Sequence, residues 1–297
     1  MEAGVATQRA RRLRAAVVRD YVTLTKPKVQ SLLLFTTVTT MYVAGTPSLR
    51  LVLLTCLGGA LSAGGAGAIN HYLDRDIDAL MRRTADRPVP AGRVSPRAAL
   101  AYGVALGVAS FVLLAATVNV LSAVLAAAGL LGYVLVYTLW LKRSTPQNIV
   151  IGGAAGAVPP LVAWAATTGR LSGSALYLFA IVFYWTPPHF WALSLLMKDD
   201  YERAGVPMLP VVRGERETRR QIVLYSLLLV AVTMLPFAAR LFDGIYLAAA
   251  LVLGGVLMWL ALRLSRRADK RSALRLYLYS LAYLALLFAA MVVDARV

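Results

Sequence analysis

Three polar side chains recur at four-residue intervals where a long apolar segment runs into an arginine-rich one: Asn70, Asp74 and Asp78. Residues four apart are neighbours on a helix, with Cβ atoms about 6 Å apart, so both carboxylates point the same way. Mg²⁺ takes oxygen ligands and is usually held by one or two carboxylates together with substrate phosphates. The spacing predicts a catalytic metal site for a diphosphate, with Asp76, turned about 200° away, as a bystander.

The alternative is that these charges only mark the end of a membrane helix, as charged residues commonly do. An interfacial cap does not need a repeat at positions i, i+4 and i+8. Ionisable groups that face a cavity at the membrane are, in addition, functional candidates. The repeat therefore favours the metal site.

The composition is that of a polytopic membrane protein. The 297 residues are 59% hydrophobic and 15% charged, and the mean hydropathy is +0.68. Apolar runs of about 17 to 25 residues can cross a bilayer as helices. Nine such runs are expected, at 30–47, 51–72, 98–118, 121–141, 149–168, 173–195, 222–239, 244–262 and 276–292. They predict an all-α bundle over residues 30–297, around a central cavity open to the cytoplasm, after a basic cytoplasmic tail of residues 1–29.

The net charge of +17 reflects topology and does not indicate a nucleic-acid partner. All but four of the 31 lysines and arginines lie in the N-terminal tail and in every second connection between the expected helices. The positive-inside rule then places the N-terminus in the cytoplasm and the C-terminus outside. The single cysteine, Cys56, excludes a disulfide framework and any multi-cysteine metal site.

The chemistry is expected at the cytoplasmic end, where two long inner loops are rich in acids and bases. In the first loop, residues 81–93, prolines and a glycine end the helix, and arginines offer planar forks that match phosphate oxygens. Inner-loop arginines also follow from topology alone. The three nearest the carboxylates, Arg82, Arg83 and Arg87, are therefore the preferred substrate-binding residues.

The second long loop again places carboxylates at the end of an expected helix. Asp199 and Asp200 are adjacent and diverge by about 100° on a helix, so only one should point inward, and Asp200 is preferred. A second acidic end that faces the first would let two metal ions hold one diphosphate. Asp200 is therefore expected to be a catalytic metal ligand, like Asp74 and Asp78.

Two further groups are candidates on the same side. Lys142, Arg143 and Asn148 form a third polar cluster, between the fourth and fifth expected helices, that is able to bind an anionic head group. His189 follows Pro187-Pro188 and should lie within the membrane. It has two interpretations: a structural histidine bonded to a backbone carbonyl, or a ligand or hydrogen-bond partner of a bound cofactor.

Together these clusters resemble the membrane-embedded aromatic prenyltransferase superfamily, whose members are nine-helix bundles with an Asn-x3-Asp-x3-Asp motif after the second helix. Within it, the chain resembles the protohaem IX farnesyltransferases, or haem O synthases. The residues that carry the resemblance lie in the segments 24–27, 70–93, 137–153, 187–191 and 198–210. Quinone-type members carry a second Asp-x3-Asp pattern, whereas this chain has Lys198-Asp199-Asp200-Tyr201. This departure points to the haem branch and leaves the ligands of a second metal open.

The resemblance implies transfer of the farnesyl group of farnesyl diphosphate to the 2-vinyl group of haem B, with release of diphosphate. The product is haem O, for haem-copper oxidases, and the implied cofactor is Mg²⁺. The expected location is a bacterial cell membrane, among lipid, with haem A synthase or oxidase assembly proteins as partners. The further substrate-binding residues that the resemblance suggests are Lys26, Tyr137, Lys142, Arg143, Asn148, His189, Trp191, Lys198, Asp199 and Tyr201.

Some of these residues have an expected part in binding or in stabilising charge. Aromatic faces such as those of Tyr137 and Trp191 can stabilise an allylic cation by roughly 0.5 to 2 kcal/mol each. The anionic propionates of haem would suit Lys142, Arg143 or Lys198.

Two other functions remain open from the sequence. One is a prenyltransferase that acts on a quinone precursor or a chlorin. The other is an ion-coupled transporter for an anionic lipid or metabolite. Transport is disfavoured because the acidic residues gather at one face instead of near the bilayer midplane between inverted repeats, and no clear internal repeat is visible.

Overall fold

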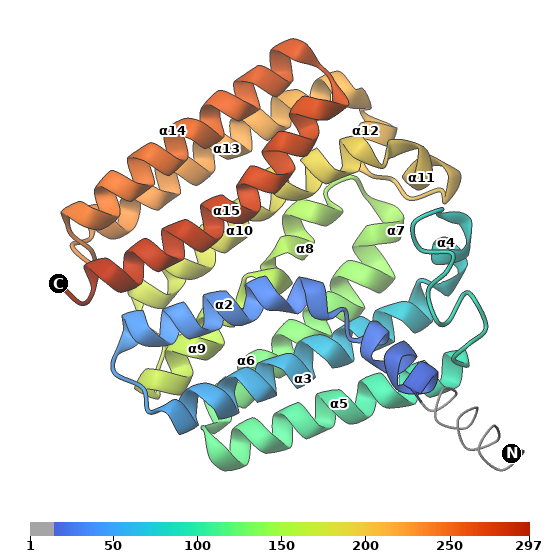
Figure 1. Ribbon diagram of the computed structural model, residues 1–297, viewed down its shortest axis with the longest axis horizontal. Helices are drawn as coiled ribbons and strands as arrows, with labels where there is room; N and C mark the ends of the chain where they lie inside the picture. Colours follow the sequence, from blue (N-terminus) through green and yellow to red (C-terminus); the bar gives the residue numbers. More distant parts are fainter. Residues whose placement is uncertain (1–14) are drawn as a thin grey trace, which may run out of the picture.

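The computed structural model describes residues 15–297, and over these residues the protein is all-helical (Figure 1). Residues 1–14 of the expected basic tail lie outside the described part, and residues 15–24 are helical. The elements that follow are α2 (Pro27–Ala44), α3 (Leu49–Leu73), α4 (Arg75–Leu80), α5 (Pro96–Thr117), α6 (Val120–Leu131), the π-helix η1 (Gly132–Leu141), α7 (Lys142–Ser144), α8 (Asn148–Gly156), α9 (Val158–Thr168), α10 (Gly173–Leu196), α11 (Lys198–Arg203), α12 (Leu209–Val212), α13 (Gly214–Ala238), α14 (Gly244–Arg267) and α15 (Lys270–Asp294).

Each of the nine expected spans coincides with one long helix or with a run of helices that continue one another. Within residues 15–297, seven of them are long and apolar enough to cross a membrane: α3, α5, Val120–Ser144, Asn148–Thr168, α13, α14 and α15. The other two expected spans correspond to α2 and α10, which are 18 and 24 residues long. Threonines and a glutamine in α2, and prolines and a histidine in α10, make these helices less apolar. The count of nine spans therefore stays a prediction.

The bundle closes on itself, because its last long helix packs against its first. In Figure 1 the C-terminal helices α13, α14 and α15 lie with α10 on one side, and α2, α3 and α5 on the other. Contacts between α15 and α2 join the two sides. The largest apolar cluster lies on the C-terminal side and includes Tyr246, Leu276, Tyr283 and Phe288, all fully buried.

Side-chain caps fix where several helices begin. The hydroxyl of Ser48 accepts a hydrogen bond from the backbone N–H of Leu51 at the start of α3 (3.2 Å). Asn119 caps α6 in the same way, through the N–H of Ser122 (2.8 Å). Such caps satisfy N–H groups that have no partner within the helix, and losing one typically costs about 1 kcal/mol.

Helices α3 and α5 touch through their backbones near the end of α3 that leads into the polar segment. A Cβ atom at Gly65 would lie 2.7 Å from the carbonyl oxygen of Gly103. A Cβ atom at Gly103 would in turn lie 2.9 Å from the backbone nitrogen of Ile69. Small residues allow such close helix packing in membranes. Since Ile69 precedes Asn70, this contact also fixes the position of the polar motif.

We predict that Gly103→Ala destabilises the protein by about 1 to 3 kcal/mol, because the added methyl group must push the two backbones apart. Thermal unfolding of the full chain in detergent measures the effect. Gly255→Ala is the matched control, since a Cβ atom there meets nothing within 4 Å. Equal stability of the two variants would contradict the backbone contact.

Candidate functional site

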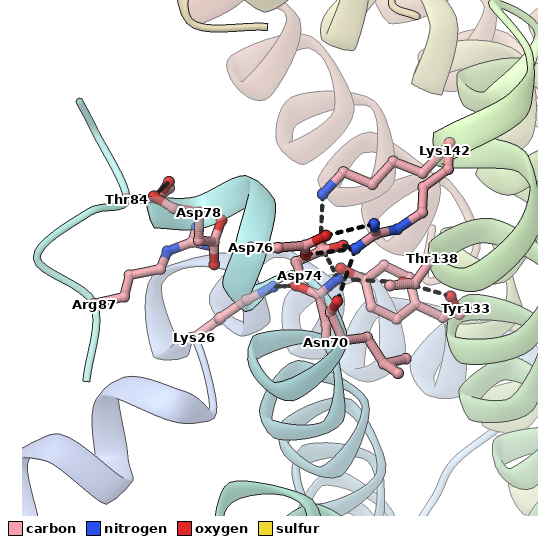
Figure 2. Close-up of polar contacts among 12 residues, drawn as sticks. Lys26, Asn70, Asp74, Asp76, Asp78, Thr84, Arg87, Tyr133, Thr138 and Lys142 are labelled. Carbon is pink, nitrogen blue, oxygen red and sulfur yellow. Dashed lines mark hydrogen bonds and ion pairs between the residues drawn. The ribbon is translucent and has the colours of Figure 1, made fainter. Parts of the chain in front are cut away.

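Asn70, Asp74 and Asp78 are buried at the junction between α3 and α4, where Asp74 faces Lys142 and Asp78 faces Arg87 (Figure 2). Helical hydrogen bonds continue across the junction, from the N–H of Asp74 to the carbonyl of Asn70 (2.9 Å) and from the N–H of Asp78 to that of Asp74 (2.7 Å). The three side chains are nearly inaccessible, whereas the side chain of Asp76 is 62% exposed. The burial of these three side chains and the exposure of Asp76 agree with the four-residue spacing, whereas their part in holding a metal ion stays a prediction.

The carboxylate of Asp74 is fully buried and has a different environment at each oxygen. Its Oδ2 is ion-paired with the Nζ of Lys142 and accepts a hydrogen bond from the side-chain amide of Asn70 (2.6 Å). Its Oδ1 has no hydrogen bond, and Nη2 of Arg143 lies 3.8 Å from it. Because buried charges need partners, Oδ1 retains the capacity to bind another donor or a cation.

The amide of Asn70 joins three parts of the chain. Its oxygen accepts a hydrogen bond from Lys26, and its nitrogen donates to the hydroxyl of Thr138 in η1 (3.2 Å). Thr138 itself donates to the carbonyl of Tyr133, five residues earlier (2.9 Å). The N-terminal segment, α3 and η1 are thus held together at one side chain.

Lys26 has a strained backbone. Its φ of 54° and ψ of 55° lie in the left-handed region, which costs a residue with a Cβ atom roughly 1 to 2 kcal/mol. A residue before proline normally adopts an extended conformation instead. Such strain persists only where the surrounding contacts hold the residue, as the hydrogen bond to Asn70 does here.

Asp78 is paired with one of the three predicted loop arginines. The Nη1 of Arg87 lies 2.7 Å from Oδ2 of Asp78, a short charge-assisted contact. The hydroxyl of Thr84 donates to the backbone carbonyl of the same aspartate (2.9 Å). The loop after α4 therefore folds back over the helix and brings Arg87 to the buried carboxylates.

Asp76 is more exposed than these carboxylates, and it binds the Arg143 side chain that also approaches Asp74. Both terminal nitrogens of Arg143 bind its carboxylate at 2.8 Å, and one of them also donates to the carbonyl of Leu73. The guanidinium group lowers the pKa of Asp76 to about 2, so this carboxylate is ionised at neutral pH. Asp76 thereby anchors α7, which also carries Lys142, against α4.

Asp200 contacts the start of the first loop, and Asp199 is exposed. The Oδ1 of Asp200 accepts a hydrogen bond from the backbone N–H of Arg82 (3.3 Å) and pairs with Arg203 (3.1 Å). In residues 15–297, no three acidic, histidine or cysteine side chains come close enough together to hold one metal ion. Asp74, Asp78 and Asp200 therefore do not form a single metal cluster.

Three other predicted substrate-binding residues lie around this contact between α11 and the first loop. The guanidinium groups of Arg82 and Arg83 have no ion pair among the described residues, which leaves them able to bind an anion. Tyr201 is buried, and burial raises the pKa of its hydroxyl.

The other predicted residues have varied surroundings. Asn148 is fully buried, donates to the carbonyl of Thr145 (2.7 Å), and has an oxygen without a partner. Lys198 pairs with Glu215 of α13 (3.4 Å) and not with the carboxylates. The ring centroids of Tyr137 and Tyr133 lie 5.3 Å apart. The Tyr137 ring packs directly on Gly152, where a Cβ atom would come within 2.4 Å of the ring.

His189 is buried between two aromatic rings, those of Trp185 at 4.3 Å and Tyr277 at 4.8 Å. Its Nδ1 lies 2.7 Å from the hydroxyl oxygen of Ser280. That hydroxyl donates its hydrogen to the carbonyl of Tyr277, so Nδ1 must be the donor to Ser280 and Nε2 carries the lone pair. His189 thus has a structural contact on one nitrogen and an acceptor on the other.

The sequence analysis did not single out Thr138, Tyr133 or Thr84 as parts of the site. Thr138 and Tyr133 lie in an apolar run, and their bond spans five residues, which fits a π-helix and not the α-helical spacing used for prediction. Thr84 acts on a backbone carbonyl, and no spacing rule identifies that contact.

Known proteins resemble this chain over most of its length. It is 57% identical over 281 residues to the Protoheme IX farnesyltransferase of Roseiflexus sp. (strain RS-1), which covers 94% of this chain and 53% of that protein. It is 57% identical over 282 residues to the Protoheme IX farnesyltransferase of Symbiobacterium thermophilum, with 94% of each chain covered. The chain spans about half the length of the first curated relatives that it matches.

A solved structure supports the fold. A UbiA homolog from Archaeoglobus fulgidus bound to GPP and Mg2+ has a TM-score of 0.67 and 18% identity, and the match covers 92% of this chain and 99% of that one. The model of the UbiA prenyltransferase family matches residues 32–289. With most of its length matched in this way, the chain belongs to the UbiA prenyltransferase family.

Proposed function

We propose that the chain is an intramembrane prenyltransferase that transfers the farnesyl group of farnesyl diphosphate to the 2-vinyl group of protohaem IX (haem B), giving haem O. The observation that carries the proposal is the buried pair of carboxylates, Asp74 and Asp78, surrounded by Lys142 and Arg87. Such a cluster suits a polar diphosphate whose tail lies among apolar helices. The names of the relatives support protohaem IX as the acceptor.

The residues present fit Mg²⁺. Asp74 offers a buried oxygen without a hydrogen-bond partner, and Asp78 contributes a second carboxylate one turn further on. Two carboxylates, with phosphate and water oxygens, meet the preference of this ion for six oxygen ligands. When bound, Mg²⁺ supplies positive charge that stabilises the charge developing on the departing diphosphate. The homolog bound to GPP and Mg2+ supports this assignment.

The chain's own cations serve the same end. Lys142, Arg87 and Arg143 lie against the carboxylates and are placed to contact phosphate oxygens beside them. Arg82 and Arg83 belong to the same loop and have no ion pair among the described residues. Fixed positive groups aimed at developing negative charge are usually the largest single contribution to catalysis.

The bond changes define what the rest of the site must do. The bond between C1 of the farnesyl group and the diphosphate oxygen breaks, and C1 bonds to a vinyl carbon of the porphyrin. The other vinyl carbon then takes the oxygen of a water molecule, which loses a proton. The farnesyl cation must be shielded from earlier attack by water, and the paired rings of Tyr133 and Tyr137 offer apolar, electron-rich faces for this.

The setting that goes with this function is a bacterial cell membrane. We place the N-terminus and the site on the cytoplasmic side, from the distribution of basic residues. Residues 1–29 form the proposed tail ahead of the membrane domain. Haem A synthase or oxidase assembly proteins are the proposed recipients of haem O.

We predict product formation only with the proposed acceptor. Purified full-length protein receives radiolabelled farnesyl diphosphate and Mg²⁺, with either protohaem IX or 4-hydroxybenzoate as the acceptor. Label is expected in the porphyrin alone, and omission of Mg²⁺ should abolish its transfer. Labelled 4-hydroxybenzoate would favour a quinone-precursor enzyme, and no labelled product with either acceptor would favour transport.

We predict that Asp74→Asn and Asp78→Asn each lower kcat by at least about 10²-fold, because each removes a charge that binds the metal and diphosphate. Asp76→Asn is the matched comparison and should lower kcat much less, by only a few-fold, since this side chain is 62% exposed and acts only through the Arg143 that it binds. Thermal unfolding of each variant separates loss of catalysis from loss of structure. Equal losses of kcat in all three variants would contradict the assignment.

A further inference from the structure

Basic residues gather at one end of α13 and α14, the end nearest α12 (Figure 1). The start of α13, residues 213–220, and the segment that joins α14 to α15, residues 263–275, together hold ten lysines and arginines but only three acids. Eight of these ten cations have no ion pair among the described residues. The positive-inside rule explains why cations lie on this side of the membrane, but not why several of them line one hollow.

The hollow has a volume of about 550 Å³ and lies between the first turns of α13 and the end of α14. We call it the arginine pocket, and its lining residues are Arg213, Arg216, Glu217, Arg219, Arg220 and Ser265. Glu217 is the single acid of this lining, and its charge is compensated by Gln221, which donates to it (2.7 Å), and by Arg220 at 3.5 Å. The lining is therefore positive overall, and guanidinium groups match the geometry of phosphate oxygens.

The arginine pocket continues into an apolar surface on the same two helices, both of which are long and apolar enough to cross a membrane. Leu224 and Leu228 follow Arg220 at four-residue intervals, so the three side chains lie along one face of α13. Both leucines are exposed, and so is Leu262, one turn before Ser265 on α14. Exposed apolar side chains on such helices contact acyl chains, so apolar surface for a lipid tail begins directly below the arginines.

Trp259 places the arginine pocket at the level of the lipid head groups. Its ring is exposed on α14, and the guanidinium group of Arg263 lies over it, 5.2 Å from the ring centroid. Tryptophan is enriched where the membrane meets water, and arginine stems lie along apolar surface there while the charge reaches outward. Ser265 lies six residues further along α14, which corresponds to about 9 Å along the helix axis. The pocket thus lies just outside the apolar layer.

We propose that the arginine pocket binds the phosphate of an anionic phospholipid, in the leaflet on the proposed cytoplasmic side, with its acyl chains along α13 and α14. Basic pockets between membrane helices on this side suit anionic head groups. A soluble phosphate would use the arginines but leave the leucines without a role. A zwitterionic lipid carries a cationic group that the unpaired arginines repel. None of the lining residues belongs to the carboxylate cluster, so this site is separate from the proposed catalytic one.

Lipid binding to the full-length protein tests the proposal. The protein in nonionic detergent is titrated with phosphatidylglycerol or phosphatidylcholine, and the Kd of the first lipid bound is measured by native mass spectrometry. The double variant Arg216→Gln/Arg220→Gln should raise the Kd of phosphatidylglycerol at least about tenfold, since each basic residue near an anionic head group contributes to binding. The Kd of phosphatidylcholine should stay the same.

The matched control is the double variant Arg271→Gln/Arg275→Gln. It removes the same charge from the same basic surface, but both residues are exposed on α15 and neither lines the arginine pocket. It should change the Kd of phosphatidylglycerol by less than about twofold. Glu217→Gln gives the opposite sign, because it removes the negative charge from the lining and should lower this Kd.

Two further measurements follow the same variants. Phosphatidylglycerol should raise the midpoint of thermal unfolding of the wild type and of the control, but not of the pocket variant, because a ligand that binds only the folded state stabilises it. Binding of farnesyl diphosphate with Mg²⁺ should match the wild type in all variants, which shows that each of them is folded.

Three results would overturn the inference. Equal weakening by the two double variants would mean that the basic surface acts through its overall charge alone. Equal weakening of both lipids by the pocket variant would mean that net lipid charge is not recognised. Displacement of phosphatidylglycerol by an equal concentration of inorganic phosphate or glycerol 3-phosphate would assign the pocket to a soluble ligand. The proposed function is unaffected by any of these results, because it depends on Asp74 and Asp78.

Discussion

The interaction on which the site depends is the burial of two carboxylates together with their own counter-charges. An unpaired charge in an apolar interior is costly, so Asp74 and Asp78 can lie inside a helical bundle only because Lys142 and Arg87 are brought to them. These partners come from η1–α7 and from the loop after α4, far apart in the chain. The fold at this end of the bundle therefore has to compensate these charges, and the arrangement of the proposed site follows from that requirement.

Several features of the bundle hold these partners in place. The backbone contact between Gly65 and Gly103 holds α3 in place five residues before Asn70. The Asn70 amide then ties the N-terminal segment and η1 to the same point, and the Arg143–Asp76 pair anchors α7 from the outside. Each contact is modest by itself, because exposed ion pairs are worth at most about 1 kcal/mol. Acting together, they fix Lys142 relative to Asp74.

Sequence periodicity was informative where one helix carries the whole pattern. The four-residue repeat separated the buried Asn70, Asp74 and Asp78 from the exposed Asp76, because that geometry is local. Periodicity could not predict contacts between different helices, because no spacing rule pairs Lys142 with Asp74 or Lys198 with Glu215. The π-helix shifts the register of Thr138, and the buried indole N–H of Trp191, which has no partner among the described residues, depends on packing, so both needed the three-dimensional structure.

The pairing of the carboxylates with lysine and arginine also bears on how the bundle assembles. With Lys142 and Arg87 in place, the buried acids are already electrically compensated, so the chain can insert and pack without a divalent ion as a structural element. On the proposed function, Lys142 and Arg87 would turn from carboxylate to phosphate when the diphosphate binds, and Asp74 and Asp78 would then hold the metal ion. The net charge of the interior would change little in this exchange.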